Sequence, residues 1–347
     1  MSIRTGLIGY GLAGRIFHLP FLLAAGMEIR AVATSRAAEI ERDLPGADCE
    51  SDPIRLIDRD DLDLVVIATP NASHFPLAKA ALEAGKHVVV DKPFTLNTRE
   101  ADDLIAVAEK CNRLLTVFHN RRWDSDFLTL GSCLGRGDLG EVVSYQCRYD
   151  RYRPEVRDRW REHPEPGSGL LFDLGAHLID QALVLFGRPD WLIADIFMQR
   201  PGAETDDGFH LLMGKGRLRI VLAAGSLVAA PEPRFVVHGS RGSFLKSGSD
   251  VQEQQLRDGA MPDHAGFGEE PPEQQAHLTI MQDGVPQTRT VPSCPGRYVD
   301  FYRGVRDAIE AKAALPVTAR EARDVINIIE LAFRSHHEGR RIELPED

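Results

Sequence analysis

The sequence lacks the features that mark membrane proteins and broad nucleic-acid binders. None of its apolar runs approaches the roughly 20 residues that a membrane-spanning helix needs. Positive charge is also short: 41 Lys and Arg stand against 52 Asp and Glu, a net charge of −11. This balance disfavours broad binding to DNA, RNA or an anionic membrane, although a local basic groove remains compatible with it. The first residues enter a strand pattern without a cleavable signal. We therefore expect a soluble cytoplasmic protein.

Cysteine is scarce as well. The five cysteines are odd in number, and no two have the two-residue spacing of zinc or thioredoxin motifs: Cys49, Cys111, Cys133, Cys147 and Cys294. The twelve histidines are scattered, and none forms a cluster with metal-ligand spacing. The pattern predicts reduced, buried thiols and no metal site.

What the sequence does contain is the composition of an ordinary globular protein, with 43% apolar and 27% charged residues. At roughly 150 residues per domain, its 347 residues suggest two domains. The first alternates apolar strand patterns with helical ones near 12–25, 74–84 and 98–112. The strands lie near 3–8, 29–33, 64–68, 87–90 and 114–118. Strands apolar on both faces and separated by helices predict a Rossmann-type, doubly wound parallel α/β sheet over residues 1–122.

The pattern changes after Trp123. Helical patterns near 125–135 and 170–186 precede strand patterns near 190–198, 207–213, 217–223, 234–238, 276–281 and 286–291. This spacing predicts an α+β domain with a mostly antiparallel sheet over residues 123–347. Residues 247–275 are rich in Gly, Pro, Glu and Gln, which predicts a long surface loop that includes one helical turn. Helices near 297–312 and 318–335 follow, the second with Thr318 as its N-cap.

A glycine-rich loop directly follows the first strand. It has the spacing G-x-G-x-x-G and comprises Gly9, Tyr10, Gly11, Leu12, Ala13 and Gly14. In this context the first glycine allows a tight turn, the second lets the backbone approach a pyrophosphate, and the third lets helix and strand pack closely. Because strand, loop, helix and a second strand occur in the required order, the loop predicts dinucleotide binding; an empty nucleotide-like fold is the alternative.

The end of the second strand indicates which dinucleotide is bound. An acidic residue there accepts hydrogen bonds from the adenosine ribose, whereas a basic residue accommodates a 2′-phosphate. The strand ends with Thr34, Ser35 and Arg36, and the next acid is Glu39. Two hydroxyls and a guanidinium favour NADP, with NAD as the second choice. Alternatively, Arg36 is only a solvated loop residue.

Two further loops lie at the carboxyl end of the predicted sheet, where open α/β folds bind ligands. The first offers Thr69, Pro70, Asn71 and His74 as cofactor contacts. The second places Asp91 and Lys92 directly after an apolar strand, with Pro93 fixing the direction of the chain. A lysine at this position can reach both the reacting hydroxyl and the nicotinamide ribose. Away from a strand end, such a charged pair is more often only a surface feature.

The second half carries an acid–base pair, Asp173 and His177. Residues four apart share one helix face, so the carboxylate can orient the imidazole and stabilise its protonated form. Such a pair can take a proton while a hydride leaves the same carbon. A buried, hydrogen-bonded histidine near a helix start is the equally compatible alternative. Asp180 lies one turn further on nearly the same face and can complete the polar cluster.

The segment 148–161 concentrates six arginines against three acids. Some of these arginines can hold cofactor or substrate groups, and we favour Trp160 with Arg161 as cofactor contacts. The alternative is salt bridging to Asp150, Glu155 and Asp158 or to a neighbouring subunit.

The sequence resembles the glucose–fructose oxidoreductase/inositol dehydrogenase family, Gfo/Idh/MocA, over nearly its whole length. The resemblance rests on the glycine loop, Thr69-Pro70-Asn71 with His74, Asp91-Lys92-Pro93, and Asp173 with Gly175 and His177. Residues 119–124 and 149–161 are similar to the branch containing NADP-dependent scyllo-inositol dehydrogenases. Many members have Glu-Lys-Pro in place of Asp-Lys-Pro, and three glycines in place of Gly167-Ser168-Gly169. The resemblance implies hydride transfer between NAD(P) and a sugar or polyol hydroxyl, and homodimers or homotetramers formed through the open sheet.

These observations lead to one functional hypothesis. Lys92, Asp173 and His177 match the family's catalytic residues: His177 would remove the hydroxyl proton, Asp173 would orient it, and Lys92 would bind the reacting oxygen. Asn120, Arg121 and Tyr152 are the further substrate candidates, suited to a neutral, hydroxylated cyclic polyol or sugar. Two alternatives stay open: a cofactor-binding sensor without turnover, and an enzyme that uses NAD(P) transiently for glycoside cleavage or dehydration.

Overall fold

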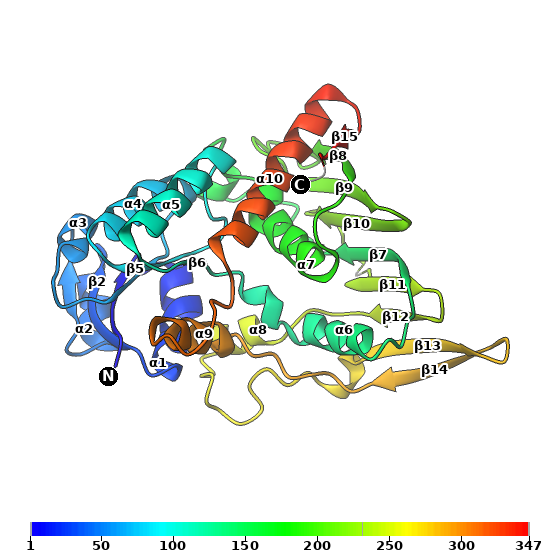
Figure 1. The fold of residues 1–347 in the computed structure, drawn as a ribbon, viewed down its shortest axis with the longest axis horizontal. Helices are drawn as coiled ribbons and strands as arrows, with labels where there is room; N and C mark the ends of the chain where they lie inside the picture. The colour runs from blue at the N-terminus through cyan, green and yellow to red at the C-terminus, as the bar shows by residue number, and fades with distance from the viewer. Residues whose placement is uncertain (1, 231, 346–347) are drawn as a thin grey trace. The chain divides into compact units, whose positions relative to one another are not determined.

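The computed structural model describes residues 2–230 and 232–345, which form two β-sheets, each with its own helices (Figure 1). The chain divides into two units. The first unit comprises residues 1–120, 252–267 and 297–326, and the second comprises 121–251, 268–296 and 327–347. The sequence places a single boundary near residue 122, so the two late segments of the first unit are the difference from that expectation.

The sheet of the first unit has the strand order β3-β2-β1-β4-β5-β6, and every pairing is parallel. Its strands are β1 (Arg4–Ile8), β2 (Glu28–Ala33), β3 (Asp48–Glu50), β4 (Leu64–Ile67), β5 (His87–Val90) and β6 (Leu115–Val117). All four residues of β4 are buried, as expected for a strand covered on both faces. This order is that of the doubly wound dinucleotide-binding fold, so the predicted fold class is confirmed for this half.

Helices flank this sheet, including those that the sequence predicts near 12–25, 74–84 and 98–112. They are η1 (Ala13–His18, π-helical), α1 (Leu19–Ala24), α2 (Ala37–Asp43), α3 (Pro53–Ile57), η2 (Asn71–Ser73, 3₁₀), α4 (His74–Glu83) and α5 (Thr98–Cys111). At the start of α5, the Asn97 side chain accepts a hydrogen bond from the backbone N–H of Glu100, and Glu100 accepts one from the N–H of Leu96. β3, α2 and α3 are absent from the sequence prediction.

The late segments complete the first unit with α8 (Gln252–Arg257), α9 (Val299–Ile309) and the start of α10 (Ala319–Glu338). Phe301 of α9 packs edge-on against Phe118, with ring centroids 5.0 Å apart. Thr116 of β6 donates a hydrogen bond to the carbonyl of Val317 (2.6 Å). Thr318 caps α10 as expected, because its hydroxyl accepts a hydrogen bond from the N–H of Glu321. The predicted loop at 247–275 contains α8 and a short 3₁₀ turn, η6 (Pro272–Gln274).

The sheet of the second unit has nine strands in the order β14-β13-β12-β11-β7-β10-β9-β8-β15. They are β7 (Val142–Arg148), β8 (Trp191–Phe197), β9 (Gly208–Lys215), β10 (Leu218–Gly225), β11 (Phe235–Gly239), β12 (Gly242–Lys246), β13 (Ala276–Gln282), β14 (Val285–Val291) and β15 (Ile342–Glu343). Only β7 and β10 pair in parallel among these strands. The predicted mostly antiparallel sheet is therefore confirmed, although β7, β12 and β15 are absent from the prediction.

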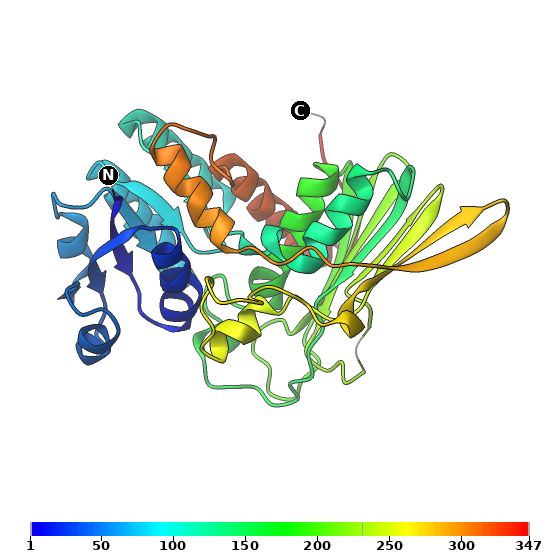
Figure 2. The ribbon, with the colours of Figure 1, turned by 90° about the horizontal axis from the view of Figure 1, so that it is seen from below.

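One face of this sheet is covered by α6 (Ser125–Gly135) and α7 (Ala176–Phe186), with the π-helical η5 (Leu171–Gly175) preceding α7 (Figure 2). Tyr145 and Cys147 of β7 point into this core and are fully buried. In the part of the chain that the structure describes, no helix of this unit lies on the opposite face.

The expectations about membrane-spanning segments and cysteines can be compared with the structure. None of the described helices is long and apolar enough to cross a membrane. All five cysteines are free thiols, but only Cys133 and Cys147 are buried. Cys49 is exposed, so the expectation of buried thiols is wrong there, because the short edge strand β3 presents this side chain to solvent.

Candidate functional site

In the glycine loop, neighbouring backbone atoms lie close to the first and third glycines, whereas the space next to the second glycine is free of protein atoms. Gly9 has φ +97°, and a Cβ on it would lie 2.5 Å from the carbonyl oxygen of Ala68. A Cβ on Gly14 would collide with the carbonyl oxygen of Gly9, whereas one on Gly11 would meet no atom within 4 Å. Only glycine therefore fits at the first and third positions, and the backbone at Gly11 stays accessible. This geometry fits the pyrophosphate of a dinucleotide.

The other loop residues differ in exposure. Leu12 is exposed, whereas Tyr10 is buried and donates a hydrogen bond from its hydroxyl to Asp43 (3.1 Å). Burial and the neighbouring Asp43 charge raise the pKa of Tyr10 to about 12, so the phenol stays protonated at neutral pH. Tyr10 thus ties the loop to α2.

Polar groups lie at the end of β2, where the adenosine ribose would be recognised. Ser35 and Arg36 are exposed, and Thr34 accepts a hydrogen bond from the backbone N–H of Arg36 (3.2 Å). The Arg36 guanidinium lies 3.4 Å from Glu39, which also lies 3.5 Å from Arg15. Arg36 is half-exposed, so this pair leaves its guanidinium accessible to an anion.

The loop after β4 is fastened to the loop after β5 by His74. Its imidazole is fully buried, with Nδ1 2.8 Å from the carbonyl oxygen of Pro93 and Nε2 3.0 Å from that of Thr69. Burial lowers the pKa of His74 even though both carbonyl oxygens favour the charged form. Ser73 donates to the Thr69 hydroxyl (2.6 Å), and Asn71 is buried in the same turn. His74 therefore holds the two loops together through the backbone carbonyls of Pro93 and Thr69.

A buried chain of polar groups supports the lysine loop after β5. Asp91 accepts a hydrogen bond from the backbone N–H of Lys92 (2.8 Å), and its carboxylate lies 3.7 Å from Nε2 of His18. The other ring nitrogen of His18 lies 2.5 Å from the hydroxyl of Tyr302 in α9. Burial alone would raise the pKa of Asp91, but hydrogen bonding and charge from His18, together with Lys92, lower it to about 2. The Lys92–Pro93 peptide is cis.

In the second unit, Asp173 and His177 lie on one continuous helical segment that begins π-helical. Asp173 belongs to η5, and His177 is buried in the first turn of α7. The sequence predicts an ordinary α-helix here, and the wider π-turn is the difference. Asp173 lies near two guanidiniums, 3.5 Å from Arg161 and 3.9 Å from Arg151. The carboxylate is thus held in a basic environment.

Asp180 and Gln181, one turn after His177 in α7, connect this helix to Arg121 and Arg122. Arg122 donates bidentate hydrogen bonds to Asp180 (2.7 and 2.9 Å), and both side chains are almost fully buried. Gln181 donates to the backbone carbonyl of Arg121 (2.7 Å). Asp180 therefore pairs with Arg122, a residue to which the sequence assigns no role in the site.

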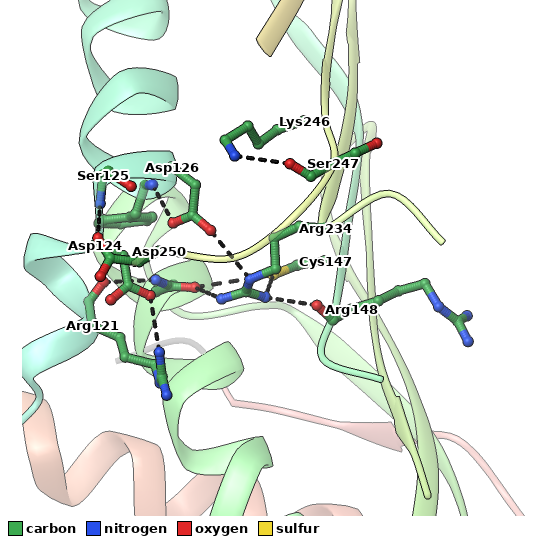
Figure 3. A network of polar contacts seen from close by, with 12 residues as sticks. Arg121, Asp124, Ser125, Asp126, Cys147, Arg148, Arg234, Lys246, Ser247 and Asp250 are labelled. Atoms are coloured by element: carbon green, nitrogen blue, oxygen red, sulfur yellow. Dashed lines mark hydrogen bonds and ion pairs between the residues drawn. The ribbon is translucent and has the colours of Figure 1, made fainter. Parts of the chain in front are cut away.

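Behind α7 lies a buried network centred on Arg234 (Figure 3). Its guanidinium donates to the Cys147 sulfur (2.7 Å) and the Gln181 side chain (3.0 Å), and lies 3.5 Å from Asp126. Burial raises the pKa of Cys147 to about 11, so the thiol stays protonated. The network fixes α6, α7 and the sheet together.

The other predicted contacts are Trp160, Arg161, Arg121 and Tyr152 of the second unit, and Asn120, which ends the first segment of the first unit. Arg161 stacks on Trp160, with 4.4 Å from the guanidinium carbon to the ring centroid. Arg121 is buried and lies 4.8 Å from the centroid of the Tyr149 ring. Tyr152 is exposed, and its backbone forms an isolated bridge with Leu227.

The chain is similar to known proteins over nearly its whole length. Residues 3–119 match the GFO_IDH_MocA oxidoreductase family in its NAD-binding Rossmann fold, and residues 132–344 match its C-terminal alpha/beta domain. The chain is 42% identical to the scyllo-inositol 2-dehydrogenase (NADP(+)) IolW of Bacillus subtilis, covering 99% of this chain and 96% of that protein. It is 44% identical to the oxidoreductase YdgJ of Escherichia coli, covering 96% of each chain.

Solved structures agree over the same length. An oxidoreductase of Bacillus subtilis, yvaA, superposes with a TM-score of 0.97 at 42% identity and 99% coverage of both chains. An oxidoreductase of Yersinia pestis superposes with a TM-score of 0.95 at 43% identity, covering 100% of this chain and 98% of that one.

Proposed function

The chain belongs to the Gfo/Idh/MocA oxidoreductase family, and on that basis we propose that it is an NADP-dependent dehydrogenase of a cyclic polyol or a sugar. One observation carries the proposal: a glycine cradle open at Gly11 occurs in the same chain as Lys92, Asp173 and His177. The similarity to IolW, named as a scyllo-inositol 2-dehydrogenase, supports an inositol-like substrate.

The proposed chemistry divides between the two units. When bound, NADP supplies the hydride acceptor. His177 accepts the proton of the reacting hydroxyl, and Asp173 orients the imidazole and stabilises its cation. Lys92 donates a hydrogen bond to the reacting oxygen and stabilises the charge that develops there. Thr69, Pro70, Asn71 and the Trp160–Arg161 pair are the further proposed cofactor contacts, and Asn120, Arg121 and Tyr152 the further proposed substrate contacts.

A spectrophotometric screen tests this function. Inositols, glucose and xylose are mixed with NADP or NAD, and absorbance at 340 nm is followed. We expect growth with at least one polyol, and a turnover about 100-fold or more lower in His177→Ala, the usual effect of losing a positioned acid–base group. The matched control is His337→Ala, an exposed histidine of α10. Near-normal turnover in His177→Ala would remove His177 from the mechanism, and cofactor binding without turnover would favour a sensor.

The preference for NADP is supported by the exposed Ser35 and Arg36 at the end of β2. Arg36→Ala should reduce the ratio of kcat/KM for NADP over that for NAD by about 10-fold or more, because a charged hydrogen bond to the 2′-phosphate is lost. Arg55→Ala, an exposed arginine of α3, is the control. A wild-type enzyme that prefers NAD would refute this assignment.

Assembly into a homodimer or homotetramer is proposed through the uncovered face of the nine-stranded sheet. One row of paired residues runs across this face and is apolar apart from Gln146: Ile193, Leu212, Val221, Gln146, Val236 and Leu245. Ile193 of β8 and Leu245 of β12 are 38% and 39% exposed, so this row presents aliphatic side chains to solvent. Light scattering should give a dimer or larger for the wild type and a smaller particle for Ile193→Lys. Val184→Lys, at an exposed position of α7, should not change the mass.

A further inference from the structure

A small cavity in the second unit, partly open to solvent, has a basic wall. Five arginines line it: Arg151, Arg153, Arg159, Arg161 and Arg200. The wall also contains four carboxylates, from Glu162, Asp173, Asp206 and Asp207, so the guanidinium groups outnumber them. The five guanidinium groups are not equally paired with these carboxylates, so the excess positive charge lies on some of the arginines and not on others.

Two of the arginines are fully used by the fold. Arg200 is buried and lies 3.0 Å from Asp207 and 3.0 Å from Glu162. It also donates to the backbone carbonyl of Glu155 (3.1 Å). Arg159 lies 2.6 Å from Glu162. These contacts hold the loop to the sheet and use the charges of Glu162 and Asp207.

The other three arginines share much weaker compensation. Arg161 and Arg151 lie 3.5 and 3.9 Å from Asp173, beyond the distance of a strong hydrogen bond. The second carboxylate on this side, Asp206, accepts a hydrogen bond from the backbone N–H of Leu171 (2.7 Å), and burial raises its pKa.

Arg153 is the clearest surplus charge. Within residues 2–230 and 232–345, no carboxylate lies within ion-pair distance of its guanidinium, which is only partly exposed. Burial and the positive charges of Arg151, Arg159 and Arg157 lower its pKa. A half-buried cation facing like charges is unfavourable unless an anion joins it.

We propose that Arg151 and Arg153, with Arg161 beside them, form a binding site for an oxyanion, either a carboxylate or a phosphate. Guanidinium groups bind both of these oxyanions bidentately. The inference rests on the proposed function, because Asp173 in the same wall is one of the proposed catalytic residues. The oxyanion has two sources: an acidic substrate, such as a sugar acid or sugar phosphate, or a phosphate of the dinucleotide.

The experiment compares wild type, Arg153→Gln, Arg153→Lys and the control Arg157→Gln. Arg157 is exposed, outside the cavity wall, and belongs to the same segment. Each protein is assayed with NADP and glucose, glucuronate or glucose 6-phosphate, and NADPH affinity is measured from its fluorescence. Inorganic phosphate binding is measured by calorimetry, with thermal melting as the folding control.

A substrate oxyanion predicts a kcat/KM about 10- to 100-fold lower in Arg153→Gln for the acidic sugars only, with partial rescue in Arg153→Lys. A cofactor phosphate predicts the same loss in NADPH affinity for every substrate. In both cases inorganic phosphate binds the wild type and Arg157→Gln but not Arg153→Gln, and the melting temperature of Arg153→Gln does not fall.

The inference is overturned if Arg153→Gln matches Arg157→Gln in substrate kinetics, NADPH affinity and phosphate binding. A failure of the proposed function looks different: no sugar or polyol is turned over by the wild type, yet phosphate binding still depends on Arg153.

Discussion

Removing the charge of Asp91 should destabilise the first unit in a pH-dependent way. The carboxylate is buried beside His18, and its pKa falls from 3.8 to about 2. At about 1.4 kcal/mol for each tenfold change in proton affinity, the folded state favours the charged form by about 2.5 kcal/mol. Asp91→Asn isolates this charge, because an amide oxygen can still accept the hydrogen bond from the Lys92 N–H.

The sign of the pH dependence follows from the lowered pKa. A carboxylate with a lower pKa in the folded state stabilises the protein above its unfolded pKa, near pH 4. That stabilisation is lost as the pH falls from about 4 through about 2. The wild type should therefore exceed Asp91→Asn by about 2.5 kcal/mol at pH 7, and the difference should shrink below pH 4.

Urea denaturation followed by circular dichroism measures this difference at pH 7, 5, 4 and 3. The control is Asp102→Asn, because Asp102 is an exposed carboxylate of α5 that pairs with Arg323 at the surface. We expect the control to cost at most about 1 kcal/mol. A stability difference between wild type and Asp91→Asn that stays constant with pH, or a control that costs as much, would refute the reasoning.

Three further predictions concern the cofactor loop and the two buried networks. Gly11→Ala should fold normally and weaken NADPH binding measured by fluorescence. Gly14→Ala should lower the free energy of unfolding in urea by about 1–3 kcal/mol, because its Cβ collides with Gly9; equal unfolding free energies for the two variants would contradict this. Tyr302→Phe removes the hydroxyl next to His18 and should cost about 1–3 kcal/mol in urea denaturation, since a buried ring nitrogen loses its partner; an unchanged midpoint would show that the contact contributes nothing. Arg234→Met strands the buried Asp126 carboxylate and should cost about 3–5 kcal/mol; a variant as stable as the wild type would mean that Asp126 is already neutral.

The parts of the site that could be predicted from the sequence are those whose partners are close along the chain. The glycine loop follows its strand directly, and Gly14 packs against the carbonyl group of Gly9 only five residues earlier. The lysine loop is recognisable for the same reason, since Lys92 directly follows the buried strand β5. These signals are local, so a single sequence contains them.

The missed parts depend on partners far apart in the sequence. Tyr302 and His18 are 284 positions apart, and Arg122 and Asp180 are 58 apart. A lone tyrosine on an amphipathic helix is indistinguishable from an ordinary core residue until the fold brings it to His18. One signal was available for Arg122. It follows Arg121 shortly after an apolar strand, and a basic side chain that is buried near such a strand needs a carboxylate partner.

Strands β7 and β12 were missed for a different reason. β7 mixes Ser144 and Gln146 with apolar residues because only one of its faces is buried, and β12 has only five residues and starts with Gly242. Short strands without a continuous apolar run give a weak pattern, and their neighbours in the sheet determine that they form.

The chain passes between the two units at five points, after residues 120, 251, 267, 296 and 326. No contiguous piece of the gene therefore encodes either unit in full. An ancestral exchange of front halves between relatives, cut near residue 122, would have delivered a nucleotide-binding sheet without α9 and its Phe301 and Tyr302 packing. We expect natural variation in this architecture to arise by substitution within an intact gene, and chimaeras that swap all three segments of a unit together to survive where simple front-half fusions fail.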